Sequence, residues 1–259
     1  MAAQLWFEVA PQEEETEDAI EAFRALVEAH PSRPEPYLKL GDCLFEDDQE
    51  EESIGAFRSL VAALPDCAAG HGRLGLALRR PGDHQDQAEG YACLKQASKL
   101  PPPQLDVLLA LGEMELRFRS DSGQAIIQLN KCLRLKPQGE QLFAARLCKA
   151  EALVENEDVE EAIDEYRALT APAFHQQQGR AHPSVVVSLG LLEAEHGDRE
   201  EGFALLRKHL VEDLSETLGS FRKDKGCCQK YYSAFDEFAD LLADGDLDDD
   251  AEKYRAMGK

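Results

Sequence analysis

The stretch from Tyr37 to Pro65 reads YLKLGDCLFEDDQEEESIGAFRSLVAALP, and it predicts two amphipathic helices joined by an acidic turn. Leu40 and Leu44 are one helical turn apart, which gives the first helix an apolar stripe. Gly41 follows Leu40 directly. Because glycine has no side chain, it allows a second helix to approach closely at that point.

The second half of the stretch predicts the helix that makes this approach. Ser53 and Phe57 are again one turn apart and place a small residue beside a large one at the crossing. Pro65 then ends the helix, because proline has no backbone N–H and disfavours the helical conformation in the residue before it. A single helix pair cannot bury its apolar faces by itself, so the pattern predicts further copies along the chain.

Independent markers of this pattern recur with nearly the same period. The Leu-Gly pair returns at Leu74-Gly75, Leu111-Gly112 and Leu189-Gly190. The first two steps, counted from Gly41, are 34 and 37 residues. The helix-ending prolines, separated by 34, 37 and 35 residues, are Pro31, Pro65, Pro102 and Pro137. The small/large pairs of the second helices recur as Ala19/Phe23, Gly90/Leu94, Ala125/Leu129, Ala162/Tyr166 and Gly202/Leu206.

This succession resembles the tetratricopeptide repeat family, whose repeat is a helix–turn–helix of about 34 residues with a Leu-Gly pair, small and aromatic positions and a closing proline. The resemblance covers residues 11–259. It implies an all-α fold, a right-handed α-solenoid of about six to seven repeats, of which the first and last are incomplete.

The repeat rhythm also predicts how the chain is divided. Residues 1–10 are expected to form an N-terminal cap or tail, and residues 11–216 the solenoid. Residues 217–230 interrupt the pattern and are expected to be an irregular linker rich in basic residues and cysteine. Residues 231–259 then predict a C-terminal helix pair of the same kind.

The charge balance favours some partners over others. The chain has 28 basic and 51 acidic residues and a net charge of −23. Such a surface repels the phosphates of nucleic acids and anionic lipid headgroups, and it attracts basic proteins or peptides. Solubility alone also explains an acidic surface. We therefore predict a protein or peptide partner, basic in one interpretation, and no nucleic acid.

Three further features bear on location. The longest apolar runs are far below the length of a membrane span, so no membrane insertion is predicted. The first residues do not form a secretory signal, and the seven cysteines have no CxxC spacing. A reducing compartment, the cytoplasm or the nucleus, is the expected location, unless an organellar transit peptide has been removed.

No motif predicts catalysis, a cofactor or a metal site. The sequence has no phosphate-binding glycine loop ending in Gly-Lys-Ser/Thr, no HExxH and no GxSxG. The acidic runs 46–52 and 244–250 lack the ligand spacing of a calcium loop. We therefore expect no enzyme activity, no cofactor and no metal.

In the tetratricopeptide repeat family, the first helix of each repeat lines a concave surface that binds partners. Transferred through the Leu-Gly pairs, this resemblance implies a groove whose charge is mixed, then basic, then acidic along the chain. The residues it predicts are Leu38, Lys39, Asp42, Phe45, Glu46, Arg73, Leu76, Arg79, Arg80, Leu109, Glu113, Leu116, Arg117, Leu147, Glu151, Val154, Glu155, Val187, Leu191, Glu195, Asp236, Glu237, Asp240 and Asp244.

Some family members clamp the C-terminal carboxylate of a chaperone with asparagines and basic residues. The matching positions here hold Leu38, Asp42 and Arg73 and no asparagine, so this clamp is broken.

Three functions stay open on the sequence. The first is a non-enzymatic scaffold or adaptor that binds a partner peptide or helix in the groove. The second is an acidic chaperone that escorts a basic client such as a ribosomal protein or a histone, and high salt should release such a client. The third is a regulatory subunit of an enzyme complex, which should change the turnover of its partner.

Overall fold

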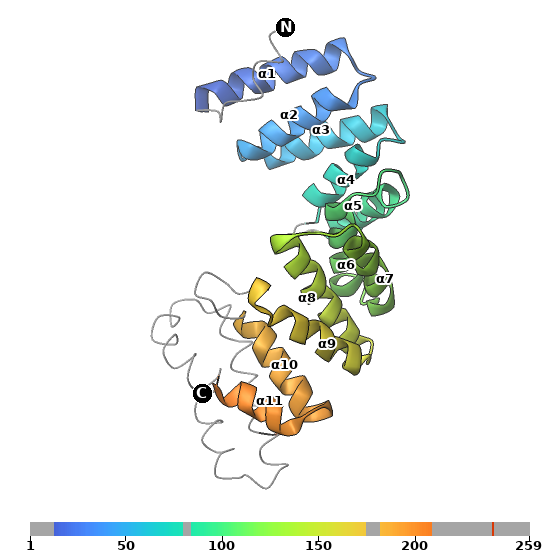
Figure 1. Ribbon diagram of the computed structural model, residues 1–259. Helices are drawn as coiled ribbons and strands as arrows, with labels where there is room; N and C mark the ends of the chain where they lie inside the picture. The colour runs from blue at the N-terminus through green and yellow to red at the C-terminus, as the bar shows by residue number, and fades with distance from the viewer. Residues whose placement is uncertain (1–12, 80–83, 175–181, 209–239, 241–259) are drawn as a thin grey trace. The chain divides into compact units, whose positions relative to one another are not determined.

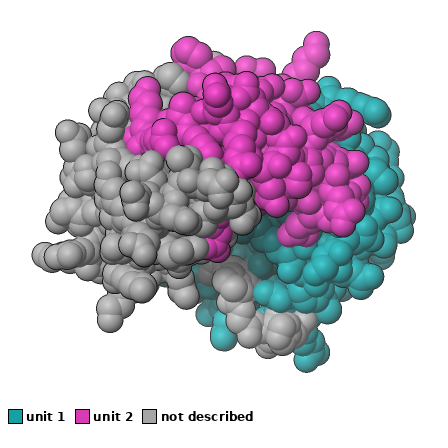
Figure 2. Space-filling model, turned by 90° about the horizontal axis from the view of Figure 1, so that it is seen from below, with its two compact units in different colours: residues 1–135 teal, residues 136–259 magenta. Residues whose placement is uncertain are grey.

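The computed structural model describes residues 13–79, 84–174, 182–208 and 240, and these form helices and connecting turns without a β-strand (Figure 1). The chain divides into two compact units, residues 1–135 and 136–259, coloured teal and magenta in Figure 2. Each unit is described by itself below. The predicted cap, the predicted linker and, apart from Asp240, the predicted C-terminal helix pair lie outside the described residues.

The described residues of unit 1 form three helix pairs preceded by one further helix (Figure 1). Its helices are α1 (Glu13–Ala29), α2 (Pro34–Glu46), α3 (Glu50–Ala63), α4 (Ala68–Ala77), α5 (His84–Ala97), α6 (Leu105–Arg117) and α7 (Ser122–Arg134). The pairs α2/α3, α4/α5 and α6/α7 correspond to the predicted repeats. Helix α1 packs on α2 and takes the place of the second helix of a preceding repeat.

The packing of unit 1 places the first helices of the repeats side by side. Each helix packs on the next one in the chain, and in addition α2 packs on α4 and α4 packs on α6. Helices α2, α4 and α6 therefore form one wall of the unit. This arrangement is the helical-repeat geometry that the sequence predicts.

The Leu-Gly glycines lie where the two helices of each pair cross, as predicted. A Cβ added to Gly41 would lie 2.4 Å from the ring of Phe57, and Ser53 Oγ donates a hydrogen bond of 2.7 Å to the Gly41 carbonyl. A Cβ on Gly75 would lie 2.6 Å from Leu94 Cγ. The large residue that fills each glycine's gap is thus the large member of the predicted small/large pair.

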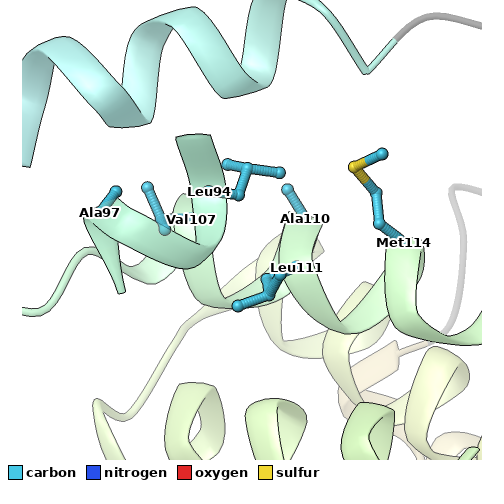
Figure 3. Close-up of a cluster of buried hydrophobic side chains, with 6 residues drawn as sticks. All are labelled: Leu94, Ala97, Val107, Ala110, Leu111 and Met114. Atoms are coloured by element: carbon cyan, nitrogen blue, oxygen red, sulfur yellow. The ribbon is translucent and has the colours of Figure 1, made fainter. Parts of the chain in front are cut away.

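The core continues from one repeat into the next. Figure 3 shows a buried cluster to which α5 contributes two residues and α6 four: Leu94, Ala97, Val107, Ala110, Leu111 and Met114. Helix α5 is the second helix of one repeat and α6 the first helix of the following one. Each repeat therefore buries its apolar face against its neighbour, which is why one repeat cannot be stable alone.

Unit 2 repeats the same design. It contains α8 (Gly139–Glu155), α9 (Val159–Leu169), a short 3₁₀ turn η2 (Pro172–Phe174), α10 (Pro183–His196) and α11 (Arg199–Leu206). In α10/α11 a Cβ on Gly190 would lie 2.7 Å from Leu206 Cγ. In α8/α9 Ala150 replaces the glycine, and it is buried in a cluster with Ile163 and Tyr166.

Three turns between paired helices contain a left-handed residue that the sequence does not predict, at Asp48, Ser120 and Glu157. Asp48 and Glu157 have φ values of 57° and 65°, in the left-handed region that is costly for residues other than glycine. The N–H of the following residue donates to a carbonyl of the last helical turn, at 2.9 Å from Gln49 to Leu44 and from Asp158 to Leu153. The left-handed residue thus allows a free carbonyl at the end of the helix to accept a hydrogen bond, as helix-capping glycines do.

We expect Glu157→Gly to raise the free energy of unfolding by about 0.5–1 kcal/mol, because glycine adopts a positive φ without steric cost. Glu157→Gln is the control, since it removes the charge without freeing the backbone, and it should leave stability unchanged. Urea unfolding followed by circular dichroism measures both. Equal effects of the two substitutions would mean that charge, not backbone strain, governs this turn.

Candidate protein-binding groove

A groove of about 680 Å³ lies on the wall formed by α2, α4 and α6 in unit 1. Its lining also includes one residue each from α3 and α5, and the residues that follow the ends of α4 and α6. The twelve lining residues are Asp42, Phe45, Phe57, Arg73, Leu76, Ala77, Arg79, Gln87, Glu113, Met114, Arg117 and Phe118.

Helical spacing explains why the first helices present these residues together. Asp42 and Phe45 are three residues apart on α2, and Arg73 and Leu76 are three apart on α4. Residues at this spacing share one face of a helix. Since the three first helices lie side by side, the corresponding faces join into one continuous surface.

The floor of the groove is apolar. Met114 is only 5% exposed and belongs to the buried cluster of Figure 3, so the repeat core extends to the bottom of the groove. Phe45 is different, because 47% of this large aromatic residue is exposed to solvent. Burying apolar area contributes roughly 25 cal/mol per Å², so Phe45 is the lining residue with the most to gain from a partner.

The rim carries ion pairs between successive first helices. Arg73 Nη2 lies 3.5 Å from Asp42 Oδ2, and Arg79 pairs with Glu113. The Arg73 and Arg79 side chains are 53% and 42% exposed. Pairs at such exposure contribute about 0–1 kcal/mol, so their side chains can rearrange at little cost.

The structure brings together seven of the residues predicted for the groove: Asp42, Phe45, Arg73, Leu76, Arg79, Glu113 and Arg117. Leu38 instead packs beside the buried cluster of Phe57, Leu74 and Leu78. The prediction for Leu116 is wrong, because this side chain is 4% exposed and points into the core. The remaining predicted residues of unit 1 are not part of the lining. Lys39 and Leu109 are half-buried, Glu46 is exposed, and Arg80 lies outside the described residues.

The predicted positions of unit 2 are not among the residues that line this groove. Leu147 is half-buried against the cluster that holds Tyr166. Burial, and then the charge of Glu151, raise the pKa of Tyr166 to about 12. Val154, Glu155, Glu195 and Asp240 are exposed, and Leu191 is half-buried. Val187 is only 7% exposed, so it belongs to the core and not to a binding surface. Asp236, Glu237 and Asp244 lie outside the described residues. Binding of a partner by these residues stays a prediction.

The sequence prediction missed five lining residues: Phe57, Ala77, Gln87, Met114 and Phe118. Ala77 is one turn beyond Arg73, so helical spacing alone could have added it. Phe57 and Gln87 come from second helices, and only the packing of the helices brings them to the edge of the first-helix wall.

The described residues offer little for other kinds of site. Burial raises the pKa of the Cys43 and Cys93 thiols, which keeps them protonated and unreactive at neutral pH. Within the described ranges, histidine, cysteine and acidic side chains form no group of three or more that could hold a metal ion. No helix in the same ranges combines the length and the apolar character that crossing a membrane requires.

Antiparallel helix pairs with a groove across their first helices define an α-helical repeat protein, a class that generally binds other proteins on such surfaces. Residues 12–66 match the tetratricopeptide repeat model, and the helix pairs and their crossings follow that repeat through both units. Residues 12–66 are therefore identified as tetratricopeptide repeat sequence, and the described residues as a whole have the fold of a tetratricopeptide repeat solenoid. No curated protein sequence matches the chain.

Solved structures of the same fold include YrrB, described as a tetratricopeptide repeat protein with an unusual peptide-binding site. It is 18% identical, with 78% of this chain and 98% of that chain covered and a TM-score of 0.62. The C-terminal part of a repeat protein from Cytophaga hutchinsonii is 14% identical, and the match covers 92% of this chain and 88% of that chain with a TM-score of 0.60. PilF from Pseudomonas aeruginosa is 22% identical, and the match covers 79% of this chain and 91% of that chain with a TM-score of 0.55. At these identities the likeness establishes the fold.

Proposed function

We propose that this protein is a non-enzymatic scaffold or adaptor that binds a segment of a partner protein in the groove of unit 1. The observation that carries the proposal is the exposure of Phe45. This residue lines the groove, and 47% of it is exposed to solvent. A half-exposed aromatic residue in a groove is the kind of anchor that dominates binding energy at protein interfaces. The peptide-binding site described for YrrB, a protein of the same fold, is consistent with this function.

The other two functions have less support. The net charge of −23 is the support for an acidic chaperone that escorts a basic client. The groove does not share this charge, because its lining has three arginines and two carboxylates. A regulatory subunit would use the same groove and differs only in its effect on the partner. A cytoplasmic or nuclear location fits the scaffold and remains part of the proposal.

Phe45→Ala should weaken partner binding at least about fivefold, since truncating an interface anchor costs more than about 1 kcal/mol. The test compares the wild-type protein, Phe45→Ala and Ile127→Ala as immobilised baits in a lysate of the native cells, with bound proteins quantified by mass spectrometry. Ile127 is the matched control, because it is 46% exposed on α7 and does not line the groove. Equal folding of the three baits is checked by circular dichroism.

The expected result is a partner that is retained by the wild type and by Ile127→Ala and depleted on Phe45→Ala. A partner retained equally by all three baits would place binding elsewhere and would overturn the groove as the working surface.

A further inference from the structure

The groove has a charge opposite to that of the chain around it. Basic residues are 28 of 259 in the whole chain but three of the twelve that line the groove, namely Arg73, Arg79 and Arg117. Acidic residues are 51 of 259 overall and two of the twelve. In a protein with a net charge of −23, the groove is therefore a local surplus of positive charge, and a surface of this sign attracts carboxylates.

All three groove cations are arginines, which matters for the ligand. A guanidinium presents five N–H donors in a planar fork that matches the two oxygens of a carboxylate. Arg73 donates a hydrogen bond from Nη2 to Asp42 Oδ2 at 3.5 Å. The Arg73 side chain is 53% exposed even with this contact. An incoming carboxylate can share or replace Asp42, because the existing pair contributes about 1 kcal/mol or less.

The apolar residues lie among these cations. Phe45, Leu76 and Phe118 line the same groove as the arginines, and Phe45 is the most exposed of the large hydrophobic residues described. A ligand that fits this surface needs large apolar side chains for the floor and carboxylates for the rim. A lysine- or arginine-rich segment would bring like charges together and lose affinity.

We propose that the partner segment is an acidic linear peptide in which one or two large apolar side chains are flanked by Asp or Glu side chains. This inference rests on the proposed function and names its ligand class. The carboxylates are those of side chains within the segment, so a free C-terminus is not required.

The test uses three fluorescent peptides with the same leucine and phenylalanine positions and with capped ends, in which the remaining variable positions are Glu, Gln or Lys. Fluorescence anisotropy measures their affinity for the full chain at about 50 mM and about 300 mM salt. Only binding that is lost in Phe45→Ala is assigned to the groove. The Glu peptide should bind about tenfold or more tightly than the Gln peptide at low salt and lose most of this advantage at high salt, and the Lys peptide should bind most weakly.

Arg73→Gln should weaken the Glu peptide roughly fivefold and leave the Gln peptide unchanged, because a charge-assisted hydrogen bond is lost. Arg24→Gln is the matched control. The Arg24→Gln substitution also removes an ion pair between helices, with Glu52 at 2.5 Å. Because Arg24 does not line the groove, the affinities for the Glu peptide and the Gln peptide should both stay at the wild-type value.

Groove binding by the Gln or Lys peptide that equals or exceeds that of the Glu peptide would overturn the acidic-ligand inference and leave the proposed function standing. The same holds if no peptide binds while a cellular partner still depends on Phe45. Failure of all peptides together with the absence of any Phe45-dependent partner would overturn both.

Discussion

Gly75→Ala should lower the free energy of unfolding by about 2–3 kcal/mol, although alanine is the better helix former. The reason is the crossing of α4 and α5. The added Cβ would lie 2.6 Å from Leu94 Cγ and 2.9 Å from the Leu94 backbone nitrogen. Leu94 is fully buried in the cluster of Figure 3, so its side chain cannot move aside without disturbing that cluster. The backbone contact means that α5 itself would have to shift.

The same substitution at Gly55 is the control and should act in the opposite direction. Gly55 lies in α3, and an added Cβ would have no atom within 4 Å apart from its chain neighbours and the backbone of its own helix. Gly55→Ala should therefore raise stability by about 0.5–1 kcal/mol through helix propensity alone. Urea unfolding followed by circular dichroism measures both variants, and hydrogen exchange should locate the Gly75→Ala loss in α4 and α5. If both variants gain stability, the close crossing at Gly75 is not a constraint on the fold.

Glu193→Ala should lower the free energy of unfolding by about 2–4 kcal/mol, because it removes a buried carboxylate that joins three helices. Glu193 of α10 is 1% exposed. Its Oε2 accepts a 3.0 Å hydrogen bond from the Asp198 N–H, at the start of α11. Its Oε1 lies 2.5 Å from Arg167 Nη2 of α9 but without the angle of a hydrogen bond, so charge attraction holds this oxygen.

Two further variants separate the charge from the hydrogen bond. Glu193→Gln keeps an oxygen for the Asp198 N–H and should lose roughly half as much stability as Glu193→Ala. Glu201→Ala removes the other acid near Arg167, at 3.5 Å, but its side chain is 54% exposed and its loss should cost under about 0.5 kcal/mol. Chemical denaturation compares the three. A Glu193→Ala cost as small as that of Glu201→Ala would show that the buried carboxylate does not hold α9, α10 and α11 together.

The fold could be predicted from the sequence because its main features depend on residues within one helix pair. A glycine and a large residue at matching places in successive helices require a close crossing, and Gly41 with Phe57 and Gly75 with Leu94 meet as predicted. Prolines near the ends of helices and the recurrence of the Leu-Gly pair then set the number of repeats in the described residues. These features act within one helix pair, so they can be read from a single chain.

The groove was only partly predictable. The resemblance to the tetratricopeptide repeat family placed Asp42, Phe45, Arg73 and Glu113 on the correct face, and all four line the groove. The same resemblance assigned Leu116 to that face, but the neighbouring helices bury it. The exposure of a side chain depends on every element that covers it, and no pattern along one helix contains that information.

The sequence by itself determined the helix pairs, their period and the crossings, because each depends on residues within about one repeat length of one another. Only the tertiary structure decided which first-helix residues form the groove, which carboxylate is buried and which turns take a left-handed residue. Arg79 meets Glu113 and Glu193 meets Arg167 across different repeats. Contacts of that kind arise from how the repeats stack, and stacking is a property of the folded chain.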